Sequence, residues 1–468
     1  MQMVIIIGFV LALTLHQSGQ WWSACDSPAA TLAAIGGYLL GLAALTSVNA
    51  ALAARVARAG ESRLPAALRV HRRGMLVVNI WLLAGQAGVA LVGYGRLLAE
   101  TDLLRRIPLA GEAAALAPLI VGIYVVWLGD YPFYRAVRRC GTGPEAAARP
   151  AWSLGEYFAY NTRHQLLFVA APVGLILLAV DCLELLARRW LVSPQIDYVM
   201  LGGSLAAAAA VFLLAPLLIV RIWKTARLSD GPLRSELEAA CARLRLSYRE
   251  LLVWQSGGVI ANAGVMGVLG RVRYILLSDG LLEGADTLDV QAVFAHEAGH
   301  VIHHHIFYGG LFAVGSICLV ASLVEAAGAA MGWEAWMVEA AALAALAAVW
   351  GLGFGWISRR FERQCDVLAA WSCGQRQPGD DGDLITSDGA AIFSRALQCI
   401  ARLNGLPQAQ FNWRHGSIAS RVAYVLYLGG TRGTRRPIDR TIARIKLALW
   451  LQLAAGLAAA VALEFVVG

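Results

Sequence analysis

The chain has 468 residues, of which 58% are hydrophobic and only 15% are charged, and its mean hydropathy is +0.60. This charged fraction is well below the roughly 25% usual for soluble globular proteins, so the composition excludes that class and indicates a membrane protein. The net charge of +8 does not indicate a nucleic-acid-binding protein, because the arginines lie at the ends of apolar runs and not in one solvated patch.

Apolar runs of about 20 residues, long enough to cross a bilayer as helices, recur along the chain. We predict eight spans, at residues 29–54, 75–97, 109–127, 165–187, 198–222, 306–324, 336–357 and 447–463. Residues 3–15 form a ninth, marginal run. This run is short enough for a cleaved signal, but it lacks the positively charged start of a signal peptide, so we favour an uncleaved span.

Charged residues between the spans predict the orientation of the chain. Arginines between residues 55 and 73 fill one loop, and arginines between residues 135 and 163 fill the loop two spans later. By the positive-inside rule both loops are cytoplasmic. Three basic residues shortly after residue 220 put the next soluble segment on the same side. The turn inside the following hairpin agrees, because it carries Glu325, Glu334 and Glu339 but no basic residue.

The first soluble segment, residues 223–305, changes its sequence period along its length. A capping sequence before Pro232 predicts an amphipathic helix to about residue 246. Residues 251–262 and 265–278 are rich in Val, Ile and Leu and are broken by glycines, which predicts short strands. We expect Asp279-Gly280 to form the turn that closes these strands.

The next helix, which Asp286, Thr287 or Asp289 can cap, carries the sequence His296-Glu297-Ala298-Gly299-His300. Residues i and i+4 of a helix share a face, so both imidazoles can bind one metal ion while Glu297 faces the water that the ion carries. The spacing is typical of a zinc site with its own general base. It predicts metal-assisted hydrolysis of a peptide bond, with one zinc ion per chain.

Two histidines leave a zinc ion short of the three protein donors of a catalytic site. In the metzincin arrangement the third donor is a histidine six residues after the second, with a glycine between them. Ile306 occupies that position here and the glycine is absent, so this arrangement is excluded. The remaining common solution is a glutamate on a later helix.

The sequence from Ser358 to Asp366, Ser-Arg-Arg-Phe-Glu-Arg-Gln-Cys-Asp, follows the predicted two-span hairpin. In this order of motifs the chain resembles the HtpX-like and CAAX-prenyl-protease-type integral membrane zinc peptidases, which are gluzincins. Their pattern is a His-Glu-x-Gly-His helix, a two-span hairpin, and a helix with Ser-Arg-x-x-Glu-x-x-x-Asp. The resemblance implies that Glu362 is the third zinc ligand, and that Asp366 orients a ligand histidine from one helical turn further on.

The resemblance extends over about residues 251–427. It implies that Asn262-Ala263 lies on an edge strand that aligns the substrate backbone by strand addition. It also implies that His415 and Arg421, in the stretch His-Gly-Ser-Ile-Ala-Ser-Arg, stabilise the tetrahedral oxyanion. Cys365 stands where the family usually has alanine, and we interpret it as a small packing residue and not as a ligand.

Three histidines, His303, His304 and His305, directly follow the zinc motif. We assign them to a helix end near the membrane surface in preference to a second metal site.

The predicted fold class is a mainly α polytopic membrane protein with eight or nine transmembrane helices and a cytoplasmic zincin-type catalytic domain that contains a small β-sheet. We predict five parts in chain order. They are an N-terminal transmembrane bundle (1–222), a first catalytic part (223–305), a transmembrane hairpin (306–357), a second catalytic part with the third zinc ligand (358–446) and a C-terminal transmembrane helix (447–468).

The predicted function is that of a zinc-dependent membrane endopeptidase in protein quality control or processing, at a bacterial inner membrane. Its partners are a protein or peptide substrate and the lipid bilayer, and the sequence does not indicate an oligomeric state. One alternative is a catalytically inactive scaffold of the same fold. The other is a metal transporter, which needs ionisable ligands in the middle of spans, whereas Asp130, Asp181 and Glu184 lie near predicted span ends.

Overall fold

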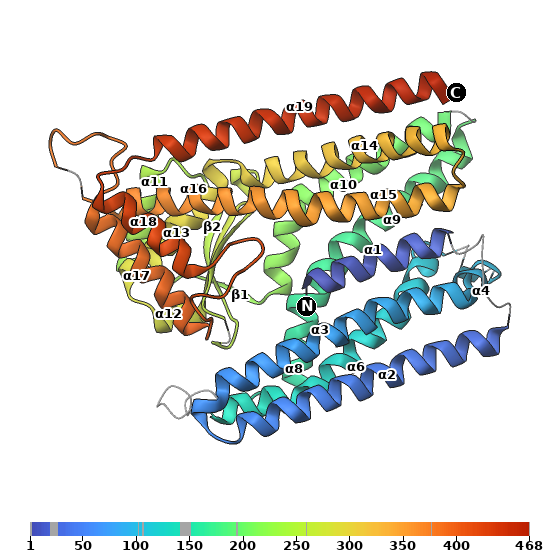
Figure 1. Cartoon of the computed structure of the whole chain (residues 1–468), viewed down its shortest axis with the longest axis horizontal. Coiled ribbons are helices and arrows are strands. Elements are labelled where there is room, and N and C mark those ends of the chain that lie inside the picture. The colour runs from blue at the N-terminus through green and yellow to red at the C-terminus, as the bar shows by residue number, and fades with distance from the viewer. Residues whose placement is uncertain are drawn as a thin grey trace. The chain divides into compact units, whose positions relative to one another are not determined.

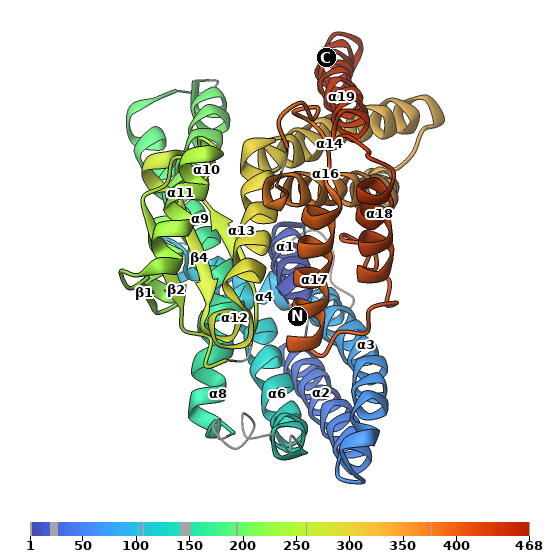
Figure 2. The same ribbon diagram turned by 90° about the vertical axis from the view of Figure 1, so that its left-hand side faces the viewer.

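The computed structural model describes residues 2–18, 27–101, 103–104, 107–140, 151–192, 195–258, 260–375 and 377–467. The chain divides into two compact units, Met1–Trp223 and Lys224–Gly468. Both units are mainly helical, and a small sheet lies in the second (Figures 1 and 2). The predicted fold class, a mainly α chain of many long apolar helices with a small sheet, is confirmed.

The first unit is built from long apolar helices. They are α1 (Gln2–Ser18), α2 (Pro28–Ala57), α3 (Leu64–Val89), α4 (Gly95–Ala99), α6 (Ala110–Cys140), α8 (Leu154–Asn161), α9 (Leu167–Trp190) and α10 (Gln195–Ile222). A π-helical turn, Ala90–Tyr94, joins α3 to α4, and a second, Thr162–Leu166, joins α8 to α9. The first of these joins is kinked at Gly93, whose φ is 106°, whereas α8 and α9 continue as one long helix.

Within the described residues, eight helical segments are long and apolar enough to cross a membrane. They are Pro28–Ala57, Leu64–Ala99, Ala110–Arg138, Leu154–Trp190, Gly202–Ile222, His305–Met331, Met337–Cys373 and Arg436–Leu463. Each predicted span overlaps one of these segments. The marginal ninth run also forms an apolar helix, Gln2–His16, but this helix is shorter than the other eight.

The second unit combines the sheet with helices of both soluble and apolar character. In chain order its elements begin with β1 (Thr225–Arg227), α11 (Pro232–Arg243), β2 (Glu250–Trp254), β3 (Ala263–Met266), β4 (Tyr274–Ser278), α12 (Asp279–Gly284) and α13 (Thr287–Ile302). They continue with α14 (His305–Met331), α15 (Ala335–Val349), α16 (Gly355–Cys373), α17 (Ser387–Leu403), α18 (Ile418–Gly430) and α19 (Arg436–Val467).

The four-stranded sheet has the order β1-β2-β4-β3, so β3 is an edge strand. β2 and β4 are parallel, whereas β1 and β3 pair antiparallel to their neighbours. The prediction of short strands is confirmed, but β1 was not predicted. The expected turn at Asp279-Gly280 is wrong, because these residues begin α12, where the Ser278 hydroxyl caps the helix by accepting a hydrogen bond from the Leu281 N–H.

Two of the apolar helices extend past the ends of the predicted spans. A π-helical turn, Trp350–Phe354, joins α15 to α16, so one helix runs from Ala335 to Cys373 with no break at residue 357. α19 begins at Arg436, about three turns before the predicted span. In Figure 1, α14, α15 and α19 run side by side, and α19 packs closely on α14 because Gly315 and Gly456 lie at their contact.

Candidate metal centre

The helix with the two motif histidines is fixed at its start by capping and by an ion pair. The Asp286 carboxylate caps α13 by accepting a hydrogen bond from the Asp289 N–H at 2.9 Å. Arg395 of α17 donates to Asp289 at 2.9 Å and to Asp286 at 3.1 Å. Asp286 was one of the three predicted caps. Arg395, which ties α13 to a helix about a hundred residues later, was not predicted.

His296 and His300 lie on one face of α13, with their ring centroids 5.2 Å apart. Glu362 of α16 faces both rings. Its Oε2 lies 3.4 Å from His296 Nε2, and its Oε1 lies 3.5 Å from His300 Nε2. One donor atom from each of the three residues can be chosen so that all lie within 4.8 Å of one another. The structure therefore brings together the two motif histidines and the glutamate that the family resemblance indicated.

These donors fit a zinc ion. At metal–ligand distances of about 2.0–2.1 Å, two donors of a tetrahedral zinc site lie about 3.3 Å apart, close to the two separations above. Two imidazoles and one carboxylate are also a donor set that catalytic zinc sites use. The carboxylate of Glu362 is buried, and a cation between it and the rings would help to compensate its charge.

A glycine allows α13 and α16 to approach closely enough for this geometry. A Cβ atom at Gly299 would lie 3.0 Å from Cys365 Sγ and 3.2 Å from Cys365 Cα. Cys365 is itself completely buried. The small residues at this contact keep the two helices at a separation that lets Glu362 reach both histidines.

Asp366 lies next to the second nitrogen of His296 and is itself held by an arginine. Its Oδ1 lies 3.0 Å from His296 Nδ1. Arg421 of α18 donates from Nε to Asp366 Oδ2 at 2.8 Å and from Nη2 to Oδ1 at 2.5 Å. The third nitrogen of Arg421, Nη1, lies 3.3 Å from Glu362 Oε2. Arg421 is thus engaged by the two carboxylates that face the histidines.

His415 reaches the centre from the loop before α18. Its Nδ1 lies 2.8 Å from Glu362 Oε1, and the side chain is 42% exposed. The loop is attached to the helix of Glu362, because Trp413 donates from Nε1 to the Gly351 carbonyl at 2.6 Å and Arg359 donates to the Trp413 carbonyl at 2.7 Å. Gly351 lies in the π-helical turn before α16. The anchoring role of Trp413 was not predicted, because no local motif marks it.

The electrostatics of the three motif residues differ although they share one helix. Burial lowers the pKa of His296, but the carboxylates of Asp366 and Glu362 outweigh it and raise that pKa to about 10. Burial, assisted by the charge of His296, lowers the pKa of His300 to about 4. Burial raises the pKa of Glu297 to about 7. A carboxyl with a pKa near neutrality is suited to taking up and returning a proton at physiological pH.

Asn262 and Ala263 lie at the start of the edge strand β3. The backbone of Asn262 is fixed on its β4 side, because its N–H donates to Ser278 Oγ at 2.8 Å and its carbonyl accepts from the Ser278 N–H at 2.9 Å. Its side chain is exposed. Asn404 fixes the preceding residue, Ala261, by accepting from its N–H and donating to its carbonyl. This role of Asn404 was also not predicted.

Comparison with known proteins agrees with this geometry. Residues 228–387 match the model of Peptidase family M48. No curated protein matches the sequence. The crystal structure of S. mikatae Ste24p matches the fold with a TM-score of 0.52 at 15% sequence identity, over 83% of this chain and 98% of that chain. The family match includes His296, His300 and Glu362. Residues 228–387 are therefore similar to Peptidase family M48, in a chain with a Ste24p-like fold.

Proposed function

We propose that the chain is an integral membrane zinc endopeptidase, with one zinc ion held by His296, His300 and Glu362. When bound, zinc in such a site lowers the pKa of a bound water toward neutrality and polarises the scissile carbonyl. The observation that carries the proposal is that these three donors, which come from helices separated by the hairpin α14–α15, lie within 4.8 Å of one another.

Glu297 is the general base in this proposal. It takes a proton from the attacking water and then passes it to the leaving amine. Its position next to His296 on α13 and its raised pKa support both steps. A carboxylate with the ordinary pKa of about 4.3 would be a weaker base and would return the proton less readily.

His415 and Arg421 have different parts in the proposal. His415 is partly exposed and contacts Glu362 at the open side of the centre, so its ring is the donor that we assign to the developing oxyanion. Arg421 is buried, and its nitrogens face Asp366 and Glu362. We therefore assign it to holding these carboxylates in place. Asp366 orients His296 through its Nδ1.

The substrate that we propose is a protein or peptide that binds in an extended conformation. Among the residues that the structure describes, β3 pairs with β4 on one side only, so its other edge offers backbone groups for strand addition. Asn262 and Ala263 lie at the end of this strand. β3 also packs near α13, which places an added strand close to the metal centre.

The active site faces the cytoplasm in this proposal. The segment from Arg435 to Lys446 at the start of α19 carries five basic residues beside the catalytic part, whereas the turn between α14 and α15 at the other end of the hairpin carries Glu334. By the positive-inside rule the basic end is cytoplasmic. A bacterial inner membrane, with a role in quality control or processing of membrane proteins, is the setting that we propose.

Two other functions have less support. An inactive scaffold would not require both histidines, Glu297 and Glu362 in this arrangement. A metal transporter would require free ionisable ligands within the spans. Instead, Asp130 lies 2.6 Å from His71, Asp181 accepts from the Leu109 N–H, and Glu184 pairs with Arg188.

The test is the Glu297→Gln substitution, with Glu325→Gln as the matched control. Glu325 is exposed near the end of α14 that lies away from the metal centre. The same chemical change there should leave both cleavage and zinc content unchanged. Glu297→Gln should abolish cleavage of a membrane-protein substrate while the purified chain retains its zinc, measured by elemental analysis. A zinc-loaded Glu297→Gln chain that still cleaves would contradict the assignment of the general base. A wild-type chain that binds no zinc would contradict the proposed function.

A further inference from the structure

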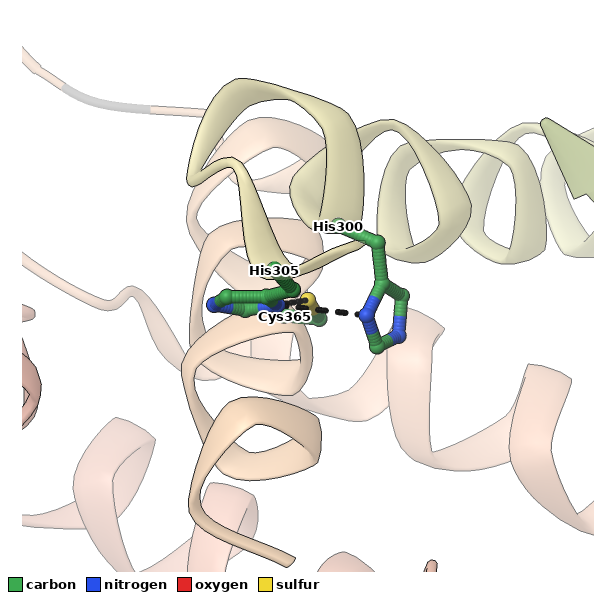
Figure 3. Close-up of side chains that lie close together, drawn as sticks. All are labelled: His300, His305 and Cys365. Atoms are coloured by element: carbon green, nitrogen blue, oxygen red, sulfur yellow. Dashed lines mark hydrogen bonds between the residues drawn. The ribbon is translucent and has the colours of Figure 1, made fainter. Parts of the chain in front are cut away.

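A fourth histidine contacts the metal centre, on the side away from Glu362. His305, the first residue of α14, is buried, and its Nδ1 lies 3.2 Å from Nδ1 of His300 (Figure 3). The Cys365 sulfur lies 3.5 Å from the same nitrogen of His305. The ring is stacked on Phe361, with the centroids 4.0 Å apart and an interplanar angle of 3°. His305 therefore has a fixed orientation, with Nδ1 directed at the nitrogen of His300 that faces away from Glu362.

The other nitrogen of His305 is fixed by a chain of hydrogen bonds that begins on α19. Asp439 accepts a hydrogen bond from Nε2 of Gln364 at 2.6 Å. Because only the amide nitrogen of Gln364 can donate to a carboxylate, its Oε1 must face His305, whose Nε2 lies 2.9 Å away. An amide oxygen accepts only, so Nε2 of His305 carries the proton. Gln364 is buried, which leaves this amide no solvent alternative.

These contacts determine the protonation of His300. A neutral His305 with its proton on Nε2 has a lone pair on Nδ1, so the 3.2 Å contact is a hydrogen bond donated by Nδ1 of His300. The Cys365 thiol can donate to the same lone pair. With its proton on Nδ1, His300 presents the lone pair of Nε2 toward Glu362, as a metal ligand requires.

We propose that His305 is a positioning residue that, through Gln364 and Asp439, holds His300 in the tautomer that can bind zinc. The inference rests on the proposed function, because it concerns how a zinc ligand is prepared. It gives each ligand histidine its own partner behind the metal centre, with Asp366 serving His296 and His305 serving His300.

His300, His305 and Cys365 also offer three donors within 4.8 Å of one another, which is the arrangement of a second metal site. A neutral imidazole has a lone pair on only one of its two nitrogens. His300 could therefore bind metal ions at both sites only as an imidazolate, with neither nitrogen protonated. The hydrogen-bond chain accounts for the same contacts with neutral rings. We therefore favour the hydrogen-bond arrangement over a second metal site. The number of zinc ions bound per protein molecule separates the two.

The first experiment compares His305→Phe with His304→Asn in the full chain purified in detergent. Phenylalanine keeps a ring that can stack on Phe361 but removes the acceptor. His304, which directly precedes His305, is exposed and has a φ of +57°, a conformation that asparagine tolerates, so its substitution is the matched control. Zinc affinity is measured by competition with a chromophoric chelator. His305→Phe should weaken it roughly 10- to 100-fold, as loss of a partner behind a ligand does, while the control stays within about twofold.

A second pair of variants tests the tautomer separately from packing. Asp439→Asn is nearly isosteric, but it no longer fixes which end of the Gln364 amide faces His305, so zinc affinity should fall by about 10-fold or more. Adding Gln364→Glu to Asp439→Asn exchanges the two groups. The carboxylate on residue 364 then accepts from the His305 N–H, and the amide on residue 439 donates to that carboxylate. The double variant should therefore recover most of the lost zinc affinity. A purely structural role predicts no such recovery.

The outcomes are distinguishable. Equal zinc affinity in wild type, His305→Phe and Asp439→Asn would overturn the inference while leaving the proposed function intact. Two zinc ions per wild-type chain, with one lost in His305→Phe, would overturn it in favour of a second metal site. If wild type binds zinc no better than Glu362→Gln does, the proposed function itself fails, and the inference fails with it.

Discussion

Replacing Arg421 with methionine tests how strongly the buried carboxylates depend on their cation. The guanidinium contacts Asp366 at 2.8 and 2.5 Å and Glu362 at 3.3 Å, and Asp366 is completely buried. A zinc ion at the proposed site would compensate part of the charge of Glu362, but Asp366 is completely buried and cannot regain hydration. Breaking such a pair by removing one partner costs about 3–5 kcal/mol, because the other charge stays buried. We expect Arg421→Met to destabilise the chain by about this amount.

The assay is denaturant unfolding of the purified chain in detergent, with Arg432→Met as the control. Arg432 lies 2.7 Å from Asp380, but its side chain is 75% exposed, so the same substitution there should cost about 1 kcal/mol or less. Adding Asp366→Asn to Arg421→Met removes the unpaired charge and should recover part of the loss. A cost for Arg421→Met no larger than that of the control would refute the reasoning.

Three other predictions concern the metal, the loop of His415 and pH. A chelator should lower the unfolding temperature of wild type but not of Glu362→Gln, because a ligand that binds the folded chain stabilises it, by about 2.7 kcal/mol at 100 times its Kd. Trp413→Phe removes the hydrogen bond to the Gly351 carbonyl, so cleavage should fall while zinc content is unchanged. Burial raises the pKa of Glu250, but hydrogen bonds from Arg234 and the Leu251 N–H outweigh it and lower the pKa below 4.5. The ionised Glu250 therefore stabilises the folded chain above pH 4.5. This stabilisation is lost as the pH falls through the pKa of Glu250 in the folded state. The difference in unfolding free energy between wild type and Glu250→Gln should therefore shrink in acid, and a constant difference down to pH 3 would contradict this.

The parts of the site that could be predicted have a local signature in the sequence. The spacing of His296 and His300 is visible because a helix repeats every 3.6 residues. The spans are visible because each needs a long uninterrupted apolar run. Glu362 has no such signature. It was found only through the order of motifs that the chain shares with a family, and the structure shows the reason, since the contact is made across a hairpin.

The features that were missed depend on contacts between distant segments. Trp413, Asn404 and Gln364 each act on a residue far away in the chain, and no spacing in the sequence marks such a pair. The start of α19, at Arg436, was missed for another reason. A change from apolar to polar residues marks where a helix meets the membrane surface, but a helix ends only where its backbone finds a cap or a break.

The close approach of α13 and α16 has a consequence for biogenesis. In the chain, α13 precedes the α14–α15 hairpin and α16 follows it. When a ribosome has just made the two motif histidines, Glu362 has therefore still to be synthesised. The two halves of the centre can meet on one side of the bilayer only after α14 and α15 have crossed it and returned. We expect a nascent or uninserted chain to be inert, so that integration into lipid acts as the maturation step.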